Sequence, residues 1–369
     1  MKAILFHEAI CPEGTQWDQR IGELCDEAVF AEEQGFHGYA QSEQHFANGE
    51  AIISAPEIGL AYVAARTNRI RLRLASFNLL PYNHPARILE QVAMLDILSG
   101  GRFEIGGARS NNPKTLEAFQ IDPSRTREYR DEYLEIIGRS LTTGFIEQNS
   151  ELFKIPKRRI SPWLPTRRPP PVHISTTSQE SHEQAAAAGC GAMSGLGILG
   201  WDYVANSLAA YERGLERAQP VVGSITRRFA SFSVGTCCHE DRKVARKITQ
   251  KNTSDFLRVI IGWMTKLAQT AEGYEYMARI EEIRERVDDI DFLVESAPYI
   301  MAGTPDDILE KVRQLYDMGV DDVIWRVDGM GHETNMQTLE MLGKYVIPEM
   351  NKWPDRRPTQ EFVKGTDVA

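Results

Sequence analysis

The sequence predicts an α/β fold, a (β/α)8 TIM-type barrel, and three observations lead to this prediction. Eight apolar runs of strand length alternate with longer helical patterns along the chain, which is typical of βαβ units. A length of 369 residues is enough for one large barrel. A doubly wound sheet is the weaker alternative, because no GxGxxG sequence lies between the first expected strand and its helix.

The expected strands are short and are bounded by polar or turn-forming residues. They cover residues 3–7, 37–41, 70–77, 102–107, 172–176, 191–196, 229–236 and 322–327. The helical patterns between and after them cover residues 17–34, 56–66, 85–98, 125–141, 178–188, 203–218 and 335–350.

Prolines, glycines and capping residues place several helix ends. Pro56 and Pro85 stand at expected first helical positions, where a missing backbone N–H is not needed. Thr304 precedes Pro305 and two acidic residues, which predicts a capped helix start before the last strand. Gly35 follows the last residue of the first helical pattern, where glycine commonly ends a helix.

The barrel is expected to form one domain over residues 1–352, with insertions before strands five and eight. Residues 151–171 are rich in proline and basic residues and should form an ordered surface excursion. Residues 240–298 are mostly helical, and they form either a lid over the pocket or extra helices outside the barrel. Residues 353–369 are polar and are expected to be a mobile tail.

Composition and charge limit the possible partners. The net charge of −10 disfavours nucleic acid and anionic membranes as partners, and no apolar run approaches the length of a membrane-spanning helix. The five cysteines show no CxxC and no Cys/His ligand spacing, which indicates reduced thiols. We therefore expect a soluble, cytoplasmic protein.

Polar side chains gather where the expected strands end, and barrel enzymes carry their chemistry at these ends. They include His7, Gln44, His45, Ser76, Asn78, Arg109, Ser110, Thr177, Ser178 and Trp201. The set is rich in amides and hydroxyls, and Glu43 is the main acid near it. No HxH or DxD pair follows a strand and no GxSxG is present, so neither a metal site nor a serine hydrolase is expected.

Arg109 and Ser110 form a candidate phosphate site, with Ser178 and Ser181 adding hydroxyls at a helix N-terminus. For Arg109 the alternative is a salt bridge across the barrel mouth. For Ser178 the alternative is ordinary helix capping, which is the more common role.

His45 is a candidate general acid or base, because histidine changes its charge near neutral pH. Its alternative role is structural, at a hydrogen-bonded strand end. His7 ends the first expected strand, and an inward orientation there would also bring it into the site.

Sequence motifs spread along almost the whole chain resemble those of the luciferase-like flavin monooxygenases, closest to the bacterial luciferase α-subunit branch. The matching segments are Glu33-Gln34-Gly35-Phe36, Ser42-Glu43-Gln44-His45-Phe46, Thr67-Asn68-Arg69-Ile70, Leu80-Pro81-Tyr82-Asn83-His84-Pro85, Glu90, Leu95-Asp96, Ser99-Gly100-Gly101-Arg102-Phe103, Gly106, Ala108-Arg109 and Ala302-Gly303-Thr304-Pro305-Asp306. Each segment alone is weakly specific, and the set is specific together.

This resemblance implies a TIM-type barrel that binds reduced FMN at the strand ends. An NAD(P)H-dependent flavin reductase would supply the reduced FMN, and O2 with that flavin would oxidise a small organic substrate. The resemblance places the family's phosphate-holding arginine at Arg109, and its residues after strand five at Thr177 and Ser178, with Ser181 one turn further on. We add Ser110 and Trp201 to the expected flavin-binding residues from their positions at strand ends.

The family's non-proline cis peptide bond, which supports the flavin, would lie near Ser76, Phe77 and Asn78. Two departures bear on the chemistry. Gln44 stands where luciferase has a histidine implicated in catalysis, so either His45 or His7 would act in its place or the substrate would need no base. Ala108 replaces the luciferase cysteine near the flavin, so light emission is not implied.

The favoured function is a two-component FMN-dependent monooxygenase that hydroxylates its substrate or inserts oxygen in a Baeyer–Villiger reaction. The alternatives are a deazaflavin-dependent hydride-transfer enzyme on the same barrel and a non-catalytic flavin-binding protein. By analogy with the family, the helices over residues 56–66 and 85–98 would pair two copies in a homodimer.

Overall fold

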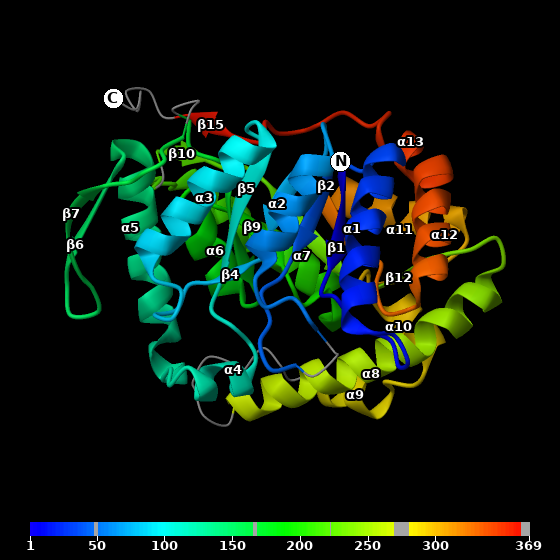
Figure 1. Cartoon of the computed structure of the whole chain (residues 1–369). Helices are drawn as coiled ribbons and strands as arrows, with labels where there is room; N and C mark the ends of the chain where they lie inside the picture. The colour runs from blue at the N-terminus through cyan, green and yellow to red at the C-terminus, as the bar shows by residue number, and fades with distance from the viewer. Residues whose placement is uncertain (48–50, 165–167, 222, 269–279, 363–369) are drawn as a thin grey trace.

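A computed structural model describes residues 1–47, 51–164, 168–221, 223–268 and 280–362 (Figure 1). It confirms the predicted fold: eight parallel strands close into a barrel, and helices lie between them. The barrel strands are β1 (Lys2–His7), β2 (Gly38–Gln41), β3 (Arg71–Leu74), β5 (Phe103–Ala108), β8 (Val172–Thr176), β9 (Gly191–Ser194), β11 (Phe229–Ser233) and β14 (Asp322–Arg326). Their order around the ring is β3-β2-β1-β14-β11-β9-β8-β5, and the pairing of β3 with β5 closes it.

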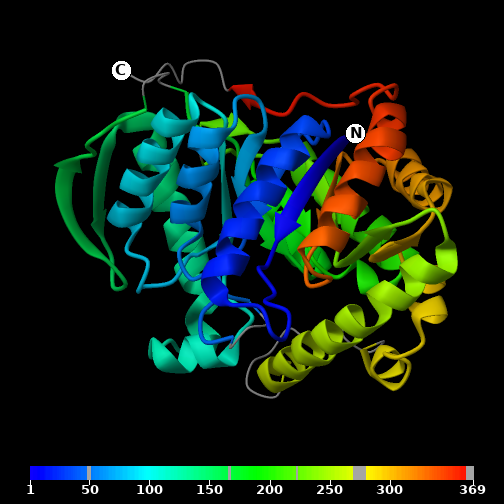
Figure 2. The ribbon, with the colours of Figure 1, turned by 45° about the vertical axis from the view of Figure 1, so that its right-hand side comes forward.

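Helices surround the barrel, and all except the unpredicted short helix over Pro113–Ala118 lie close to the predicted positions (Figures 1 and 2). They are α1 (Trp17–Glu33), α2 (Pro56–Arg66), α3 (Pro85–Ser99), α4 (Pro113–Ala118), α5 (Thr126–Thr143), α6 (Gln179–Ala187), α7 (Trp201–Glu216), α11 (Pro305–Met318), α12 (His332–Met341) and α13 (Ile347–Met350). Short 3-10 turns cover Pro123–Arg125 and Gly197–Leu199, and a π-helical segment covers Leu342–Val346. The predicted cap of α11 is present, because the Thr304 hydroxyl accepts a hydrogen bond from the Asp307 N–H.

Two of the predicted strands are each divided in the structure. The strand predicted over residues 70–77 ends at Leu74, and β4 (Phe77–Asn78) resumes beyond a cis peptide bond between Ala75 and Ser76. The implied cis bond is thereby confirmed. The strand predicted over residues 229–236 leaves the barrel after Ser233, and its continuation β12 (Gly235–Cys238) pairs instead with β13 (Ile300–Gly303).

Alternate residues of each strand face the barrel interior and the surrounding helices. On β1, Ile4 and Phe6 pack inside the barrel, whereas Leu5 packs in the layer beneath the helices. The same alternation turns Ile324 of β14 inward and Val323 outward. It therefore decides which polar residues at the strand ends reach the interior.

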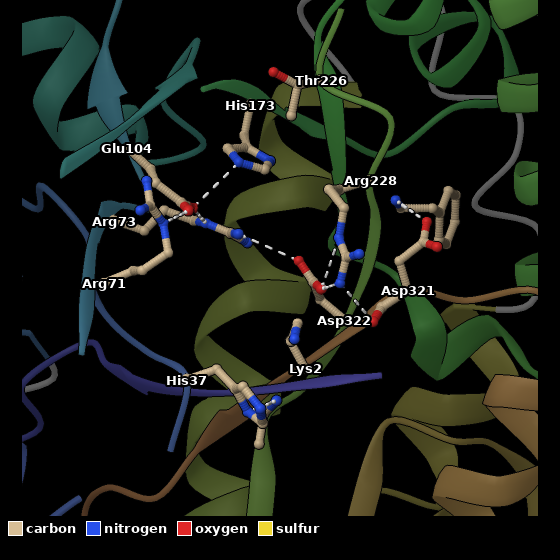
Figure 3. A network of polar contacts seen from close by, with 12 residues as sticks. Lys2, His37, Arg71, Arg73, Glu104, His173, Thr226, Arg228, Asp321 and Asp322 are labelled. Atoms are coloured by element: carbon tan, nitrogen blue, oxygen red, sulfur yellow. Dashed lines mark hydrogen bonds and ion pairs between the residues drawn. The ribbon is translucent and has the colours of Figure 1, made fainter. Parts of the chain in front are cut away.

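A layer of paired charges closes the amino end of the barrel (Figure 3). Arg73 bridges two acids, with its Nε 2.6 Å from Glu104 Oε2 and its Nη2 3.2 Å from Asp322 Oδ2. Arg228 binds the other oxygen of Asp322, and His173 Nε2 lies 3.3 Å from Glu104. These partners satisfy charges at the end opposite to the one where barrel enzymes hold their substrates.

The first insertion forms an antiparallel hairpin beside α5. Its strands are β6 (Phe145–Asn149) and β7 (Lys154–Arg159), which project at the left of Figure 1. Phe153, Ile155 and Leu164 are buried, so the excursion packs on the domain through its apolar side chains. Residues 165–167 of this predicted excursion lie outside the described residues.

The second insertion carries α8 (Arg242–Ala268), α9 (Ile280–Glu285) and α10 (Ile290–Ser296) between β12 and β13. The long helix α8 crosses the molecule below the carboxyl ends of the strands in Figure 1, and the view in Figure 2 agrees. Residues 269–279 of the predicted insertion lie outside the described residues.

The described part of the predicted mobile tail contacts the amino end of the barrel. Asp355 Oδ1 lies 2.7 Å from Arg228 Nη1, and β15 (Glu361–Phe362) pairs with β10 (Ser224–Ile225). Residues 363–369 lie outside the described residues, so the mobility of the tail stays a prediction there. Within the described residues, no helix has the length and apolarity needed to cross a membrane.

Asp96 on α3 should make stability depend on pH. Burial raises the pKa of Asp96 to about 6 from an ordinary 3.8, against the opposing charge of Arg71. The folded chain therefore binds this proton more tightly than the unfolded chain, and the free energy of unfolding from this group falls as the pH rises from about 4 to 6. Asp96→Asn is expected to be more stable than the parent protein at pH 7, with a flatter pH profile.

Urea unfolding between pH 4 and 8 measures this effect. The matched control is Glu90→Gln, which alters an exposed carboxylate on the same helix. Equal pH profiles for the Asp96 variant and the parent would show that Asp96 does not titrate in this range.

Candidate active site

A cavity opens at the carboxyl ends of the barrel strands, and side chains of α8 form part of its wall. Its lining residues are Phe6, Glu8, Ser42, Glu43, Gln44, Ala75, Ser76, Asn78, Ala108, Arg109, Ser110, Asn111, Ser175, Thr176, Thr177, Met193, Gly195, Leu196, Phe232, Val234, Phe256, Ile260, Met264 and Tyr299. The lining combines an apolar set, such as Met193 and Phe232, with a polar set of amides, hydroxyls and few charges. Such a mixture is typical of a small-molecule or cofactor site.

Glu43 organises the loops at one side of the cavity. Its Oε2 accepts a hydrogen bond of 2.8 Å from the Asn78 backbone N–H, and both carboxylate oxygens lie 2.8 Å from Asn83 Nδ2. His45 Nε2 lies 2.8 Å from Glu43 Oε1. This buried carboxylate therefore joins the end of β2 to the segment around β4.

His45 itself does not line the cavity. Its ring packs against Phe119 and Tyr82, with centroid distances of 5.1 and 5.6 Å. The His45 carbonyl accepts a hydrogen bond from Asn112 Nδ2 at 2.8 Å. The structure thus joins His45 to the lining through Glu43, and its catalytic role stays a prediction.

Gln44 lines the cavity and donates a hydrogen bond of 3.1 Å from Nε2 to Glu8 Oε1. Burial raises the pKa of Glu8, and the nearby positive charge of Arg326 partly opposes the change. The sequence prediction did not include Glu8. The signal was present, since Ile4, Phe6 and Glu8 continue one alternation along β1.

His7 lies on the other face of β1 and does not reach the cavity. Its Nδ1 lies 3.1 Å from the Tyr39 hydroxyl, and its Nε2 lies 3.0 Å from Glu27 Oε2 on α1. The expected inward orientation is therefore not the one that the structure shows. His7 belongs to a buried polar cluster between the barrel and its helices.

Arg109, Ser110 and Thr177 lie together in the cavity lining, as candidate phosphate ligands should. Ser178 and Ser181 are not in the lining. Their hydroxyls form a capping box at the start of α6: Ser178 Oγ accepts from the Ser181 N–H, and Ser181 Oγ accepts from the Ser178 N–H. The structure thus shows the capping role for both serines.

Around the cis bond, some side chains face the cavity and others face the surrounding helices. Ser76 and Asn78 line the cavity, and Ser76 Oγ lies 2.8 Å from Ser175 Oγ. Phe77 is buried in the layer beneath the helices. Trp201 is the first residue of α7 and is not in the lining.

The family profile described as luciferase-like monooxygenase matches residues 3–322. The chain belongs to this family. Among the described residues, no group of three or more His, Cys, Asp or Glu side chains is placed to hold a metal ion.

Two curated relatives of this luciferase-like protein are monooxygenases. The alkanal monooxygenase alpha chain of the Kryptophanaron alfredi symbiont is 31% identical over 176 residues, which are 47% of this chain and 49% of that protein. The 4-hydroxyprotoasukamycin monooxygenase of Streptomyces nodosus subsp. asukaensis is 39% identical over 99 residues, or 27% of this chain and 26% of that protein. The matched regions span half or less of these relatives.

Solved structures share the luciferase-like barrel over most of its length. A monooxygenase from Streptomyces bottropensis has a TM-score of 0.78 at 22% identity, covering 95% of this chain and 100% of that one. The oxygenating constituent of 3,6-diketocamphane monooxygenase from Pseudomonas putida, solved with FMN, has a TM-score of 0.75 at 20% identity, covering 95% and 99%. A coenzyme F420-dependent tetrahydromethanopterin reductase from Methanopyrus kandleri scores 0.68 at 17% identity, covering 94% and 98%.

Proposed function

We propose that this protein is the oxygenating component of a two-component flavin monooxygenase. It would use reduced FMN and O2 to hydroxylate a small organic substrate or to insert oxygen beside its carbonyl group. The observation that carries this proposal is the cavity at the strand ends, whose lining includes Arg109, Ser110 and Thr177 together with apolar side chains such as Leu196 and Phe232. A phosphate-bearing flavin needs both kinds of surface.

The residues present fit FMN. Arg109, Ser110 and Thr177 offer a charge and hydroxyls suited to a terminal phosphate. Ala75 and Ala108 bring small side chains to the lining, which would leave room beside them for a planar ring system. In this proposal Ser76 and Asn78 border the ring, whereas Ser178 and Ser181 support the Thr177 loop from behind through the capping box.

Bound reduced FMN, together with O2, would supply the oxygen atom that is transferred. The protein groups would orient the substrate and keep water away, because stray water and protons divert such chemistry. Gln44 holds Glu8 at the cavity wall, and His45 holds Glu43 from outside it. We propose that α8 acts as the lid, since it contributes Phe256, Ile260 and Met264 to the lining.

We also propose that a separate NAD(P)H-dependent flavin reductase supplies the reduced FMN, in the cytoplasm. The diketocamphane relative is described as an oxygenating constituent, which supports such a division of labour. The deazaflavin alternative is supported by structural likeness to F420-dependent enzymes. The two cofactors can be compared directly by binding.

Anaerobic titration with reduced FMN tests the proposed function. We expect saturable binding of reduced FMN, weaker binding of reduced coenzyme F420, and a transient absorbance change when O2 is added. Adding a panel of ketones, aldehydes and phenols should then yield an oxygenated product. Binding of F420 in preference to FMN, or binding of FMN without any oxygenated product from the panel, would favour one of the two alternatives.

We propose a homodimer formed through α2 and α3. Ile58 and Tyr62 on α2 are 69% and 54% exposed, and Met94, Ile97 and Leu98 on the neighbouring α3 are 40–53% exposed. Such a patch of large apolar side chains is typical of an interface. Light scattering is expected to give twice the mass of one chain, and Ile58→Asp should shift the protein to monomer.

Val244→Asp is the matched control for this prediction, because Val244 is an exposed apolar residue on α8, a helix that is not part of the proposed interface. It should leave the mass unchanged. A parent protein with the mass of one chain would contradict the dimer.

A further inference from the structure

We propose that Arg326 is a substrate-binding residue that selects substrates carrying two coplanar oxygens with a shared negative charge, such as a carboxylate or an enolised dicarbonyl. This inference rests on the proposed function and names its substrate class. It starts from a buried guanidinium that forms no ion pair with a carboxylate among the described residues.

Strand alternation places Arg326 inside the barrel, at the carboxyl end of β14. It is the last residue of β14, two positions beyond Ile324, which packs inside the barrel. Its side chain is 1% exposed. Arg326 itself is not in the cavity lining, but four residues around it, Glu8, Val234, Phe256 and Tyr299, are. The guanidinium therefore lies directly behind the cavity wall, next to the Phe256 ring of α8.

Among the described residues, only the Nε of this guanidinium has a hydrogen-bond acceptor. Its Nε donates a hydrogen bond of 2.5 Å to the Val234 carbonyl, and its Cζ lies 3.7 Å from the centre of the Phe256 ring on α8. Within the described part of the chain, Nη1 and Nη2 are buried and have no hydrogen-bond acceptor. Buried donors of this kind are rare unless a ligand or water meets them.

Three other buried arginines differ in this respect. Arg20, Arg73 and Arg228 are each 1–4% exposed, and each binds at least one carboxylate. No ion pair of 4.0 Å or less is formed by Arg326 among the described residues. Arg20, Arg73 and Arg228 are thus paired with carboxylates, whereas Arg326, just behind the cavity wall, forms no such pair among the described residues.

Two carboxylates, Asp328 and Glu8, act on Arg326 through their charge. Asp328 is bound by Arg20 and the Ile10 N–H. Glu8 also has another partner. Its Oε1 accepts the hydrogen bond from Gln44. Burial raises its pKa, so Glu8 gives up its negative charge more readily than an exposed glutamate does. Arginine keeps its charge under the same conditions. The positive charge of Arg326 would therefore neutralise a negatively charged group of a bound ligand.

The free nitrogens specify the kind of ligand. Nη1 and Nη2 form one edge of a planar fork, which matches two oxygens on one planar group through parallel hydrogen bonds. A carboxylate has this geometry, and so does the enolate of a 1,3-dicarbonyl compound. The Phe256 ring and the Val234 carbonyl hold the fork in place and exclude water from one side of it.

Arg326 is also far from the proposed phosphate ligand. β14, which carries Arg326, and β5, whose end precedes Arg109, are four strands apart in either direction around the ring. Two anionic groups can therefore be held at opposite sides of the cavity without competing. This separation suits a flavin phosphate at one side and a substrate oxyanion at the other.

Binding of matched probes to the full-length protein tests the inference. The probes are 2-naphthoate against 2-naphthamide for the carboxylate arm, and 1,3-cyclohexanedione against cyclohexanone for the enolate arm. We expect the parent protein to bind at least one anionic probe tenfold or more tightly than its neutral partner. Arg326→Met should abolish that preference and change the affinity for the neutral probe less than twofold.

Arg326→Lys keeps a charge but lacks the fork, so an intermediate preference is expected. If Arg326→Met does not fold, Arg326→Lys provides the test of the anion preference. Lys251→Met, which removes an exposed charge from α8, should behave as the parent does. A parent protein without any anion preference, or a preference retained in both Arg326 variants, would overturn the inference.

Reduced-FMN binding is measured on the same variants under anaerobic conditions. We expect it to change less than twofold. A large loss of flavin affinity with unchanged probe preference would assign Arg326 to the flavin and overturn the inference. Failure of the parent protein to bind reduced FMN would instead defeat the proposed function, whatever the probes show.

Discussion

Replacing Glu27 with alanine is expected to lower the free energy of unfolding by about 3–5 kcal/mol, the usual cost of removing one partner from a buried charge cluster. Glu27 is fully buried on α1, and Arg20 Nη1 donates to it at 2.8 Å. His7 and His332 lie 3.0 and 2.9 Å from its two oxygens. Without this carboxylate, Arg20 would keep Asp328 as its buried counter-charge, and both imidazoles would lose their acceptor.

Lowering the pH should also show the contribution of this charge cluster to stability. Burial alone would raise the pKa of Glu27, but hydrogen bonds from His332 and His7 outweigh it and hold the pKa well below the ordinary 4.5. The carboxylate therefore contributes stability above about pH 4.5 that is lost as the pH falls. The parent protein should lose more stability on acidification than Glu27→Ala does.

Urea unfolding of parent and variant measures both effects. Asp26→Ala is the control, because Asp26 lies on the same helix and forms an exposed ion pair of 2.7 Å with Arg66. Its loss should cost less than about 1 kcal/mol. Similar losses in the two variants would show that the buried cluster adds no more stability than a surface pair.

Replacing Arg109 with alanine is the second large expected effect. We expect the affinity for reduced FMN to fall about ten- to hundredfold, because one charge-assisted hydrogen bond to phosphate contributes about 1.5–3 kcal/mol. The fold should be unaffected, since Arg109 follows the end of β5 in the cavity lining. Anaerobic fluorescence titration measures the affinity, and the melting temperature reports on the fold.

Riboflavin separates the phosphate from the ring system. It lacks the phosphate, so parent protein and Arg109→Ala should bind reduced riboflavin equally well. Lys114→Ala removes a nearby exposed charge on α4 and should leave FMN affinity within twofold of the parent. Unchanged FMN affinity in Arg109→Ala, or an equal loss for riboflavin, would remove Arg109 from the phosphate site.

The barrel was predictable because its local signals agree with one another. Pro56 opens α2, and the apolar run over residues 172–176 coincides with β8. The break after β3 was not visible in the residue pattern, since Ala75, Ser76 and Phe77 simply continue the strand-like alternation of residues 70–74. Only the family resemblance placed a cis bond there. Backbone conformation of this kind depends on surrounding structure more than on local propensity.

From the sequence, residues near the strand ends could be named as candidates, but the side of the strand that each side chain faces was harder to predict. His7 and Glu8 are neighbours, yet only Glu8 reaches the cavity, since successive strand residues point in opposite directions. Phe77 and Asn78 repeat this pattern on β4. The α8 residues were missed individually because the path of a long insertion over the barrel is set by tertiary packing.

The three cavity residues of α8 have a consequence for how this scaffold can diversify. Phe256, Ile260 and Met264 recur at every fourth position, so one stripe of a single helix borders the chamber. None of them takes part in the pairing of the barrel strands. Substituting these three side chains can therefore change the shape of the cavity available to a ligand, while the hydrogen-bonded register of the barrel strands is kept.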